Sequence, residues 1–127
     1  MTIDFAATYR EAANVIRVNG HNKGDWYSVP ETGVGIQLTP AEYPVCAAGA
    51  LSIALTGAPR PTADGIPLVE AAARHLLQHL IPGYKRALAI WDLGRLWNDA
   101  PERTAADVIA AFENAARAEE MAGVKAA

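Results

Sequence analysis

The clearest repeat of hydrophobic and polar positions lies at the start of the chain, between Ile3 and Val18. Apolar residues recur there every three or four positions and form one continuous stripe, made of Phe5, Tyr9, Ala12, Ala13 and Ile16. Charged and polar residues occupy the opposite side. This spacing predicts an amphipathic helix. We expect it to end at Asn19-Gly20, because glycine tolerates the left-handed conformation that often follows a helix.

Four later segments also carry helical patterns. Residues 44–56, PVCAAGALSIALT, are apolar nearly all round, which is typical of a short helix covered by its neighbours. A third helix is predicted over Ile66–Leu80, with Val69, Ala72, Ala73, Leu76 and Leu80 as its apolar stripe. A fourth is predicted from Tyr84 to about Leu96, with Ala87, Leu88, Ile90, Trp91 and Leu96 as core candidates.

The last helix begins after the loop Trp97–Arg103. Thr104 is followed three residues later by Asp107, which is close to the S/T-x-x-E pattern that caps helix starts. Val108, Ile109, Phe112, Ala115 and Ala116 then follow at helical spacing. We expect the tail from about residue 119 to fray, since chain ends are often poorly ordered.

Between the first two helices, residues 21–44 contain three prolines and three glycines, which exclude a long helix. Val34, Ile36 and Leu38 alternate with other residues as one buried strand face requires, and a short run at Trp26–Val29 precedes them. The segment is predicted to be a small β-hairpin, with an irregular loop as the alternative. The sequence thus predicts a mainly α, single compact domain over residues 1–127, with four to five helices.

Composition and charge limit the kinds of function that are expected of this protein. Half of the 127 residues are hydrophobic (51%), many of them alanine, and the formal net charge is −3. The densest basic pair is Lys85-Arg86. Nucleic-acid binding is therefore not expected, because it usually requires a basic patch.

The chain also lacks the sequence signals of export and membrane insertion. Its first residues show no basic region followed by an apolar stretch, as a signal peptide would, and no apolar run approaches ~20 residues. Its one cysteine cannot form an internal disulfide. These features predict a cytoplasmic protein that does not contact a membrane.

Cys46 has two interpretations. Near a helix start its thiolate would be stabilised by free N–H groups and the helix dipole, as a nucleophilic cysteine requires. The small residues Ala47–Ala50 instead indicate a close helix contact, and free cysteine is usually buried. The second interpretation is favoured, while a constellation of Cys46 with His79 (or His75) and Asn98 or Asp99 stays open as a catalytic alternative.

His75 and His79 are four residues apart on one predicted helix, a spacing at which two imidazoles can share a metal ion. The residues between them do not form an HExxH motif, and a further ligand would have to come from Cys46, His21 or an acid. We expect His79 at the edge of the apolar stripe and His75 nearer solvent. The sequence therefore predicts no metal site and no cofactor, with metal binding as a remaining alternative.

Three short segments of the chain are considered together: EAANVIRVNG with the following Gly24–Tyr27, CAAGAL, and WNDAPERTAADVIAAFENAA. Together they resemble a family of small proteins of unknown function found in actinobacteria and their phages. The chain departs from that family between Trp26 and Pro44 and in the third helix. The matching positions are Trp26, Cys46, Gly49, Ala50, Trp97, Asn98, Asp99, Pro101, Arg103, Thr104 and Val108.

The resemblance implies the source of the protein and the arrangement of its segments, but the family has no assigned activity that could be transferred to this chain. The function favoured is that of a non-enzymatic accessory protein, of phage or actinobacterial origin, that binds another protein; self-association stays open. The alternative is a small thiol-dependent hydrolase or transferase. The predicted contact surface includes the 26–44 segment and the 97–103 loop, through Trp26, Tyr27, Ile36, Trp97 and Arg103.

Overall fold

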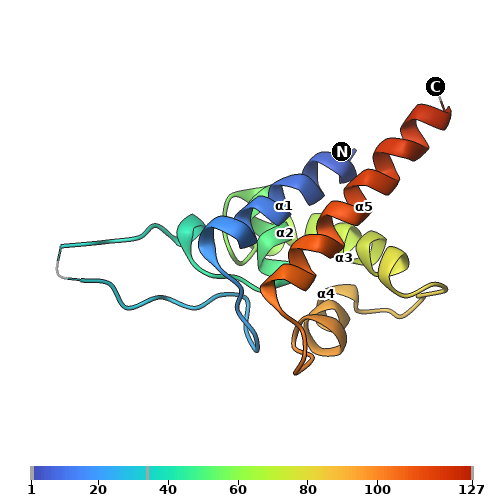
Figure 1. The fold of residues 1–127 in the computed structure, drawn as a ribbon. Helices are drawn as coiled ribbons and strands as arrows, with labels where there is room; N and C mark the ends of the chain where they lie inside the picture. The colour runs from blue at the N-terminus through green and yellow to red at the C-terminus, as the bar shows by residue number, and fades with distance from the viewer. Residues whose placement is uncertain (1, 34, 127) are drawn as a thin grey trace.

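Five α-helices form the body of the protein in the computed structural model, which describes residues 2–33 and 35–126 (Figure 1). Two short 3₁₀ turns, η1 (Pro40–Glu42) and η2 (Ala63–Gly65), and a π-helix, η3 (Leu93–Asn98), connect them. The mainly α fold is confirmed. The α-helices are α1 (Phe5–Asn19), α2 (Ala47–Thr56), α3 (Ile66–Leu80), α4 (Ala89–Asp92) and α5 (Ala105–Ala126).

Helix α1 is the centre of the packing, because it lies against both α5 and α2. In Figure 1, α1 and α5 run side by side. The predicted stripe of α1 faces this core, where Tyr9 and Ile16 meet Leu76 of α3 and Phe112 of α5 in one buried cluster. Asp4 caps the start of α1 by accepting the Ala7 N–H at 3.0 Å. No helix in the described residues is long and apolar enough to cross a membrane.

Helix α2 makes the close contact that its small residues predict. Ala47, Ala48, Gly49 and Ala50 are all buried. A Cβ atom on Gly49 would lie 2.4 Å from the Trp26 carbonyl oxygen and 3.2 Å from that of Pro59. The main chain therefore passes so near to α2 on two sides that only glycine fits at this position.

The prediction of one helix over residues 84–96 is wrong in part. Residues 84–88 are not helical, and α4 is followed by the π-helix η3, whose wider turn changes which side chains face inward. Glu70 of α3 defines where α4 begins, because its carboxylate accepts the N–H groups of Ala89 and Ile90 at 2.8 and 3.0 Å. The predicted core residues Leu88, Trp91 and Leu96 are consequently exposed.

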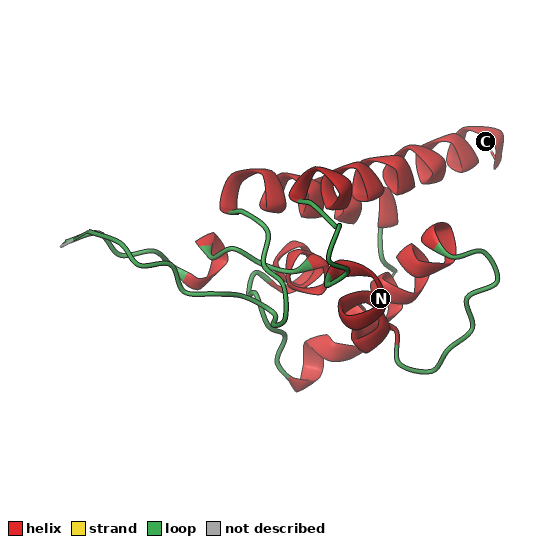
Figure 2. Ribbon diagram, turned by 60° about the horizontal axis from the view of Figure 1, so that its bottom comes forward, coloured by secondary structure: helices red, strands yellow, loops and turns green. Residues whose placement is uncertain are grey.

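The predicted β-hairpin is also not formed. Within the described parts of residues 21–45 there are only two isolated bridges, from His21 and Tyr27 to Val45. The Ser28 N–H donates to the Pro44 carbonyl at 3.1 Å. The chain between this contact and η1 projects from the helical body as an extended arm (Figures 1 and 2). Val34, one of the alternating positions, lies outside the described residues. The irregular-loop alternative describes this segment better, because its glycines and prolines prevent a regular ladder.

Helix α5 begins as predicted, with a reciprocal cap. The Asp107 N–H donates to the Thr104 hydroxyl at 3.1 Å, and the Thr104 N–H donates to the Asp107 carboxylate at 2.9 Å. The helix continues to Ala126, past the point where the sequence indicates a frayed tail. Contacts of Glu119 with α3 and of Glu120 with α1 support its later turns.

Candidate functional site

Asn98 lies at the centre of a buried hydrogen-bond network where three distant parts of the chain meet. Its side chain is fully buried at the end of η3. The amide oxygen accepts the Ala47 N–H at 2.9 Å and the His21 Nε2–H at 2.8 Å. The amide nitrogen donates to the Asn22 carbonyl at 3.0 Å and to Asp99 at 2.9 Å. Both hydrogens and both lone pairs of the amide are therefore used.

The adjacent Asp99 extends this network to the loop before the arm. Its Oδ1 accepts the Gly24 N–H at 3.0 Å as well as the Asn98 amide. Lys23 donates to the Ala100 carbonyl at 2.7 Å. The Asn98-Asp99 pair thus connects the end of η3 to the 21–24 loop and to the first N–H of α2.

Cys46 is the N-cap of α2 and is buried, as the favoured interpretation of its neighbours predicts. Its N–H donates to the Trp26 carbonyl at 3.0 Å, and its Sγ accepts the Gly49 N–H at 3.3 Å. Burial raises the pKa of the thiol to about 11, although the hydrogen bond from Gly49 acts in the opposite direction. The sulfur is therefore a neutral thiol at physiological pH, not an activated thiolate.

Native Cys46 is expected to resist alkylation. A thiol of pKa about 11 has a thiolate fraction at pH 8 roughly 200-fold below that of a free cysteine, and burial slows the reagent further. Iodoacetamide labelling at pH 8, followed by mass spectrometry, should be slow in the native protein and fast after denaturation. Native labelling at the rate of free cysteine would instead indicate a reactive thiol.

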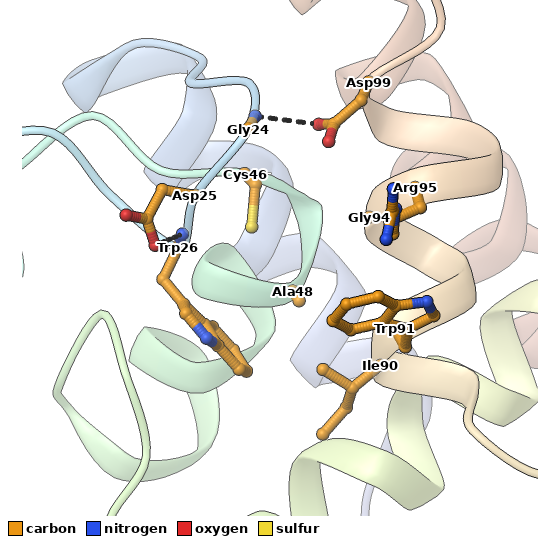
Figure 3. Close-up of a pocket in the computed structure, with 10 residues that line it drawn as sticks. All are labelled: Gly24, Asp25, Trp26, Cys46, Ala48, Ile90, Trp91, Gly94, Arg95 and Asp99. Carbon is orange, nitrogen blue, oxygen red and sulfur yellow. Dashed lines mark hydrogen bonds between the residues drawn. The ribbon is translucent and has the colours of Figure 1, made fainter.

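A pocket of about 450 Å³ opens next to this network (Figure 3). Trp26 lies on one side and Trp91 on the other, with the start of α2 between them. The Arg95 guanidinium stacks 4.8 Å from the centre of the Trp91 ring. Polar groups are contributed by Asp25, Arg95 and Asp99, and the other walls by Trp26, Cys46, Ala48, Ile90 and Trp91. Its largely apolar lining suits a hydrophobic side chain flanked by polar groups.

A second cluster lies between α3 and α5. The donor atoms of His75, His79 and Glu119 are all within 4.8 Å of one another. His75 Nδ1 lies 2.6 Å from the Tyr9 hydroxyl, and the Phe5 ring stacks on the His75 imidazole at 3.8 Å with an interplanar angle of 3°. His75 is the more buried of the two histidines, the reverse of the expectation from the helical wheel.

Burial determines the protonation of this cluster. It lowers the pKa of His75, with His79 acting in the same direction and Glu119 in the opposite one. It raises the pKa of Tyr9, and the charge of Glu119 adds to this effect. Near pH 7 the His75 imidazole is therefore mainly neutral, and the Tyr9 phenol keeps its proton.

Comparison with known proteins identifies the family. A family model described as a family of unknown function (DUF6197) matches residues 1–118. The chain belongs to DUF6197. No curated protein and no solved structure matches it. Membership of DUF6197 therefore agrees with the expected kind of family, one without an assigned activity, and the site has to be interpreted from its own geometry.

In this DUF6197 chain the residues of the catalytic alternative fall into two separate groups. Cys46, Asn98 and Asp99 lie together around the start of α2. His79 instead contacts Glu119 and His75 at the α3–α5 interface. The imidazole that bonds to Asn98 belongs to His21, which the sequence suggested only as a metal ligand.

The predicted partner-binding residues lie at the base of the arm, on the arm and beside η3. Trp26 and Tyr27 are partly buried at the base, where the Tyr27 and Tyr43 rings stack 5.6 Å apart. Ile36 is exposed on the arm. Trp97 is partly buried, and the Arg103 guanidinium lies over its ring, 4.3 Å from the ring centre. The side chains of Trp97 and Arg103 therefore pack against each other.

Several residues of the two sites could not be recognised from the sequence, among them Glu119, Tyr9 and Trp91. Glu119 was assigned to a frayed tail, Tyr9 only to the core, and Trp91 to the interior. The Tyr9 hydroxyl was the available signal, because a buried tyrosine usually hydrogen-bonds a partner. Nothing in the sequence indicated that Glu119 contacts His79, since the two residues are 40 positions apart in the chain.

Proposed function

We propose that this protein is a non-enzymatic module that binds an extended segment of another protein through its arm, Ser28–Thr39. The arm carries two exposed aliphatic side chains, Val29 (65% exposed) and Ile36 (57%), although most Val, Ile and Leu side chains in the body are buried or partly buried. Exposed aliphatic groups on a projecting segment mark interaction sites when they gather in one place. This exposure carries the proposal.

The backbone of the arm supports the same function. Among its described residues, the one backbone hydrogen bond between the two sides is that of the turn, from the Ile36 N–H to the Gly33 carbonyl at 3.1 Å. Of the other groups of residues 29–33 and 35–38, the Ile36 carbonyl accepts the Thr32 hydroxyl at 2.5 Å and Pro30 has no N–H. The remaining N–H and C=O groups form no backbone hydrogen bond among the described residues and can pair with a polypeptide added alongside. Strand addition of this kind derives affinity from main-chain hydrogen bonds and specificity from alternate side chains.

The pocket at the base of the arm supplies a second contact. Trp26, which lines it, is the residue immediately before Tyr27 and the arm. An apolar side chain of a partner segment that pairs with the arm could enter between Trp26 and Trp91. Aromatic anchors in such pockets often contribute much of the binding energy. The partner is thus expected to present an extended, aliphatic segment rather than a charged surface.

Loss of the arm's aliphatic groups is expected to weaken partner binding at least roughly tenfold. A photo-crosslinking amino acid at position 36 in the host cell should first capture the partner, identified by mass spectrometry. The affinity of the purified partner for the double variant V29S/I36S is then measured. Both positions are exposed, so the fold should be retained.

The matched control is V124S, which removes an aliphatic side chain that is 73% exposed on α5. It should leave the affinity unchanged. Equal loss in V124S and V29S/I36S, or cross-links from position 124 to the same protein, would contradict the proposal. Cross-links from position 36 only to a second copy of this chain would assign the arm to self-association instead.

We also propose that the chain originates from actinobacteria or their phages. The support is the resemblance of its CAAGAL and WNDAPERT segments, not the family match, which assigns no source. Neighbouring genes test this directly. Genes for phage structure or host defence beside this one would support the proposal, and a purely metabolic neighbourhood in other bacteria would contradict it.

A further inference from the structure

Two helices bring three metal-ligating side chains to one point. His75 and His79 lie on the same face of α3, because residues four apart are neighbours on a helix. Glu119 reaches them from α5. Its Oε1 lies 3.3 Å from His79 Nε2 and in direct contact with His75 Nε2. One carboxylate oxygen thus faces the same nitrogen of two imidazoles.

We propose that this cluster binds one divalent transition-metal ion, Zn²⁺ or a similar ion, through His75 Nε2, His79 Nε2 and Glu119 Oε1. Two imidazoles and a carboxylate form a donor set that Zn²⁺ accepts, with a solvent molecule in the fourth position. This inference is independent of the proposed arm function, since no residue is shared between the two.

The spacing of one pair of donor atoms already fits a tetrahedral ion, and the third donor lies within 4.8 Å of both. Zn–N and Zn–O bonds of about 2.0–2.1 Å place neighbouring ligand atoms roughly 3.3 Å apart. The 3.3 Å between His79 Nε2 and Glu119 Oε1 has this length. His75 Nε2 and Glu119 Oε1 lie closer and have to separate slightly. Both histidines and Glu119 are partly exposed, so solvent can occupy the fourth position.

The orientation of His75 is held by groups that do not themselves ligate. Phe5 stacks flat on the imidazole and limits its tilt, while the Tyr9 hydroxyl at 2.6 Å from Nδ1 limits its rotation. Metal-binding histidines characteristically form such a hydrogen bond through the nitrogen that does not bind the ion. Ring orientation is therefore established before any ion arrives.

The hydrogen bonds of the Tyr9 hydroxyl favour a metal cation at His75 Nε2. The Tyr9 hydroxyl lies 2.6 Å from His75 Nδ1 and 3.2 Å from the Ala72 carbonyl, but it has one hydrogen to donate. Both contacts are hydrogen bonds only if Nδ1 carries a hydrogen and donates to Tyr9. A neutral imidazole with its hydrogen on Nδ1 leaves the Nε2 lone pair facing Glu119, where a metal ion removes the repulsion.

A proton on His75 Nε2 would also satisfy these contacts, and His79 Nε2 can likewise donate a hydrogen bond to Glu119 at 3.3 Å. His79 Nε2 faces the same oxygen of Glu119, and the two rings lie edge to face with centres 5.0 Å apart. A metal ion uses all three donors at once. The convergence of three donors supports the metal site, and metal titration distinguishes it from two separate hydrogen bonds to Glu119.

Titration with Co²⁺ and Zn²⁺ tests the proposal on the full chain, purified without a histidine tag and treated with a chelator. Co²⁺ should produce the visible absorption bands of a four-coordinate site and saturate at one ion per chain. Zn²⁺ should then displace it. Isothermal titration calorimetry measures the Zn²⁺ affinity directly.

Four variants assign the ligands. H79A and the nearly isosteric E119Q should each weaken Zn²⁺ binding at least roughly 100-fold, since each removes a ligand. Y9F should weaken it roughly 10- to 100-fold, as loss of an orienting hydrogen bond does. E120Q is the matched control, because Glu120 pairs with Arg10 and not with the histidines; its affinity should equal that of the wild type.

Circular dichroism and thermal unfolding establish that each variant is folded, which is expected because His79 and Glu119 are partly exposed. One saturable ion that is lost in H79A and E119Q but kept in E120Q supports the site. The absence of 1:1 binding, or the same affinity in H79A, E119Q and the wild type, would overturn it.

Discussion

Replacing Asn98 with alanine should lower the free energy of unfolding by about 3 kcal/mol, because each buried group left without its partner costs about 1–3 kcal/mol. The substitution removes the acceptor of the Ala47 N–H and of His21, and the donor to the Asn22 carbonyl. It also leaves a cavity at a fully buried position. Urea denaturation followed by circular dichroism measures the change.

Two further variants separate the hydrogen bonds of Asn98 from its packing. N98D keeps an acceptor for Ala47 but loses the donor and brings a carboxylate next to Asp99, so it should destabilise the fold although its shape is conserved. N114A removes an exposed asparagine of α5 and should cause no loss of stability. A change below about 1 kcal/mol in N98A would show that this network contributes little to stability.

Replacing Gly49 with alanine should cost about 2–3 kcal/mol, although alanine is the better helix former. Its Cβ would lie 2.4 Å from the Trp26 carbonyl oxygen and 2.9 Å from Val45 Cβ, so the loop before the arm or α2 has to move. The hydrogen bond from the Cys46 N–H to Trp26 should weaken with that movement. Chemical denaturation measures the stability, and faster alkylation of Cys46 would report the opening.

Gly123 provides the matched control for G49A. It lies in α5, and a Cβ there would meet nothing within 4 Å. G123A should therefore stabilise the protein slightly, by up to about 1 kcal/mol, through helix propensity alone. Equal changes in the free energy of unfolding in G49A and G123A would mean that the chain around α2 accommodates the added Cβ atom without strain.

Much of the helical framework was predictable because its signals are local. The stripe of α1, the bounds of α3 and the Thr104–Asp107 cap of α5 all depend on residues within one or two turns of each other. The small residues of α2 likewise predicted a close contact and a buried Cys46. Here periodicity and capping chemistry act over the same short distances as the structure they specify.

The errors occurred where distant residues decide the local conformation. Glu70 of α3 begins α4 at Ala89, so Tyr84–Leu88 is not helical and Trp91 turns outward to line the pocket. The described part of the arm has alternating residues but no further strand beside it, and an isolated two-stranded hairpin is at best marginally stable, so alternation alone did not produce one. Neither outcome is encoded in the spacing of the residues concerned.

By itself, the sequence determined a mainly helical protein with a central small-residue helix, a capped last helix and two histidines on one helical face. Only the tertiary structure decided that Asn98 bonds to His21 and that Glu119 faces His75 and His79. The physical reason is that side-chain chemistry needs atoms within about 3 Å of each other. Residues 77 positions apart reach that distance only when η3 packs beside the segment after α1, and residues 40 positions apart only when α3 packs against α5.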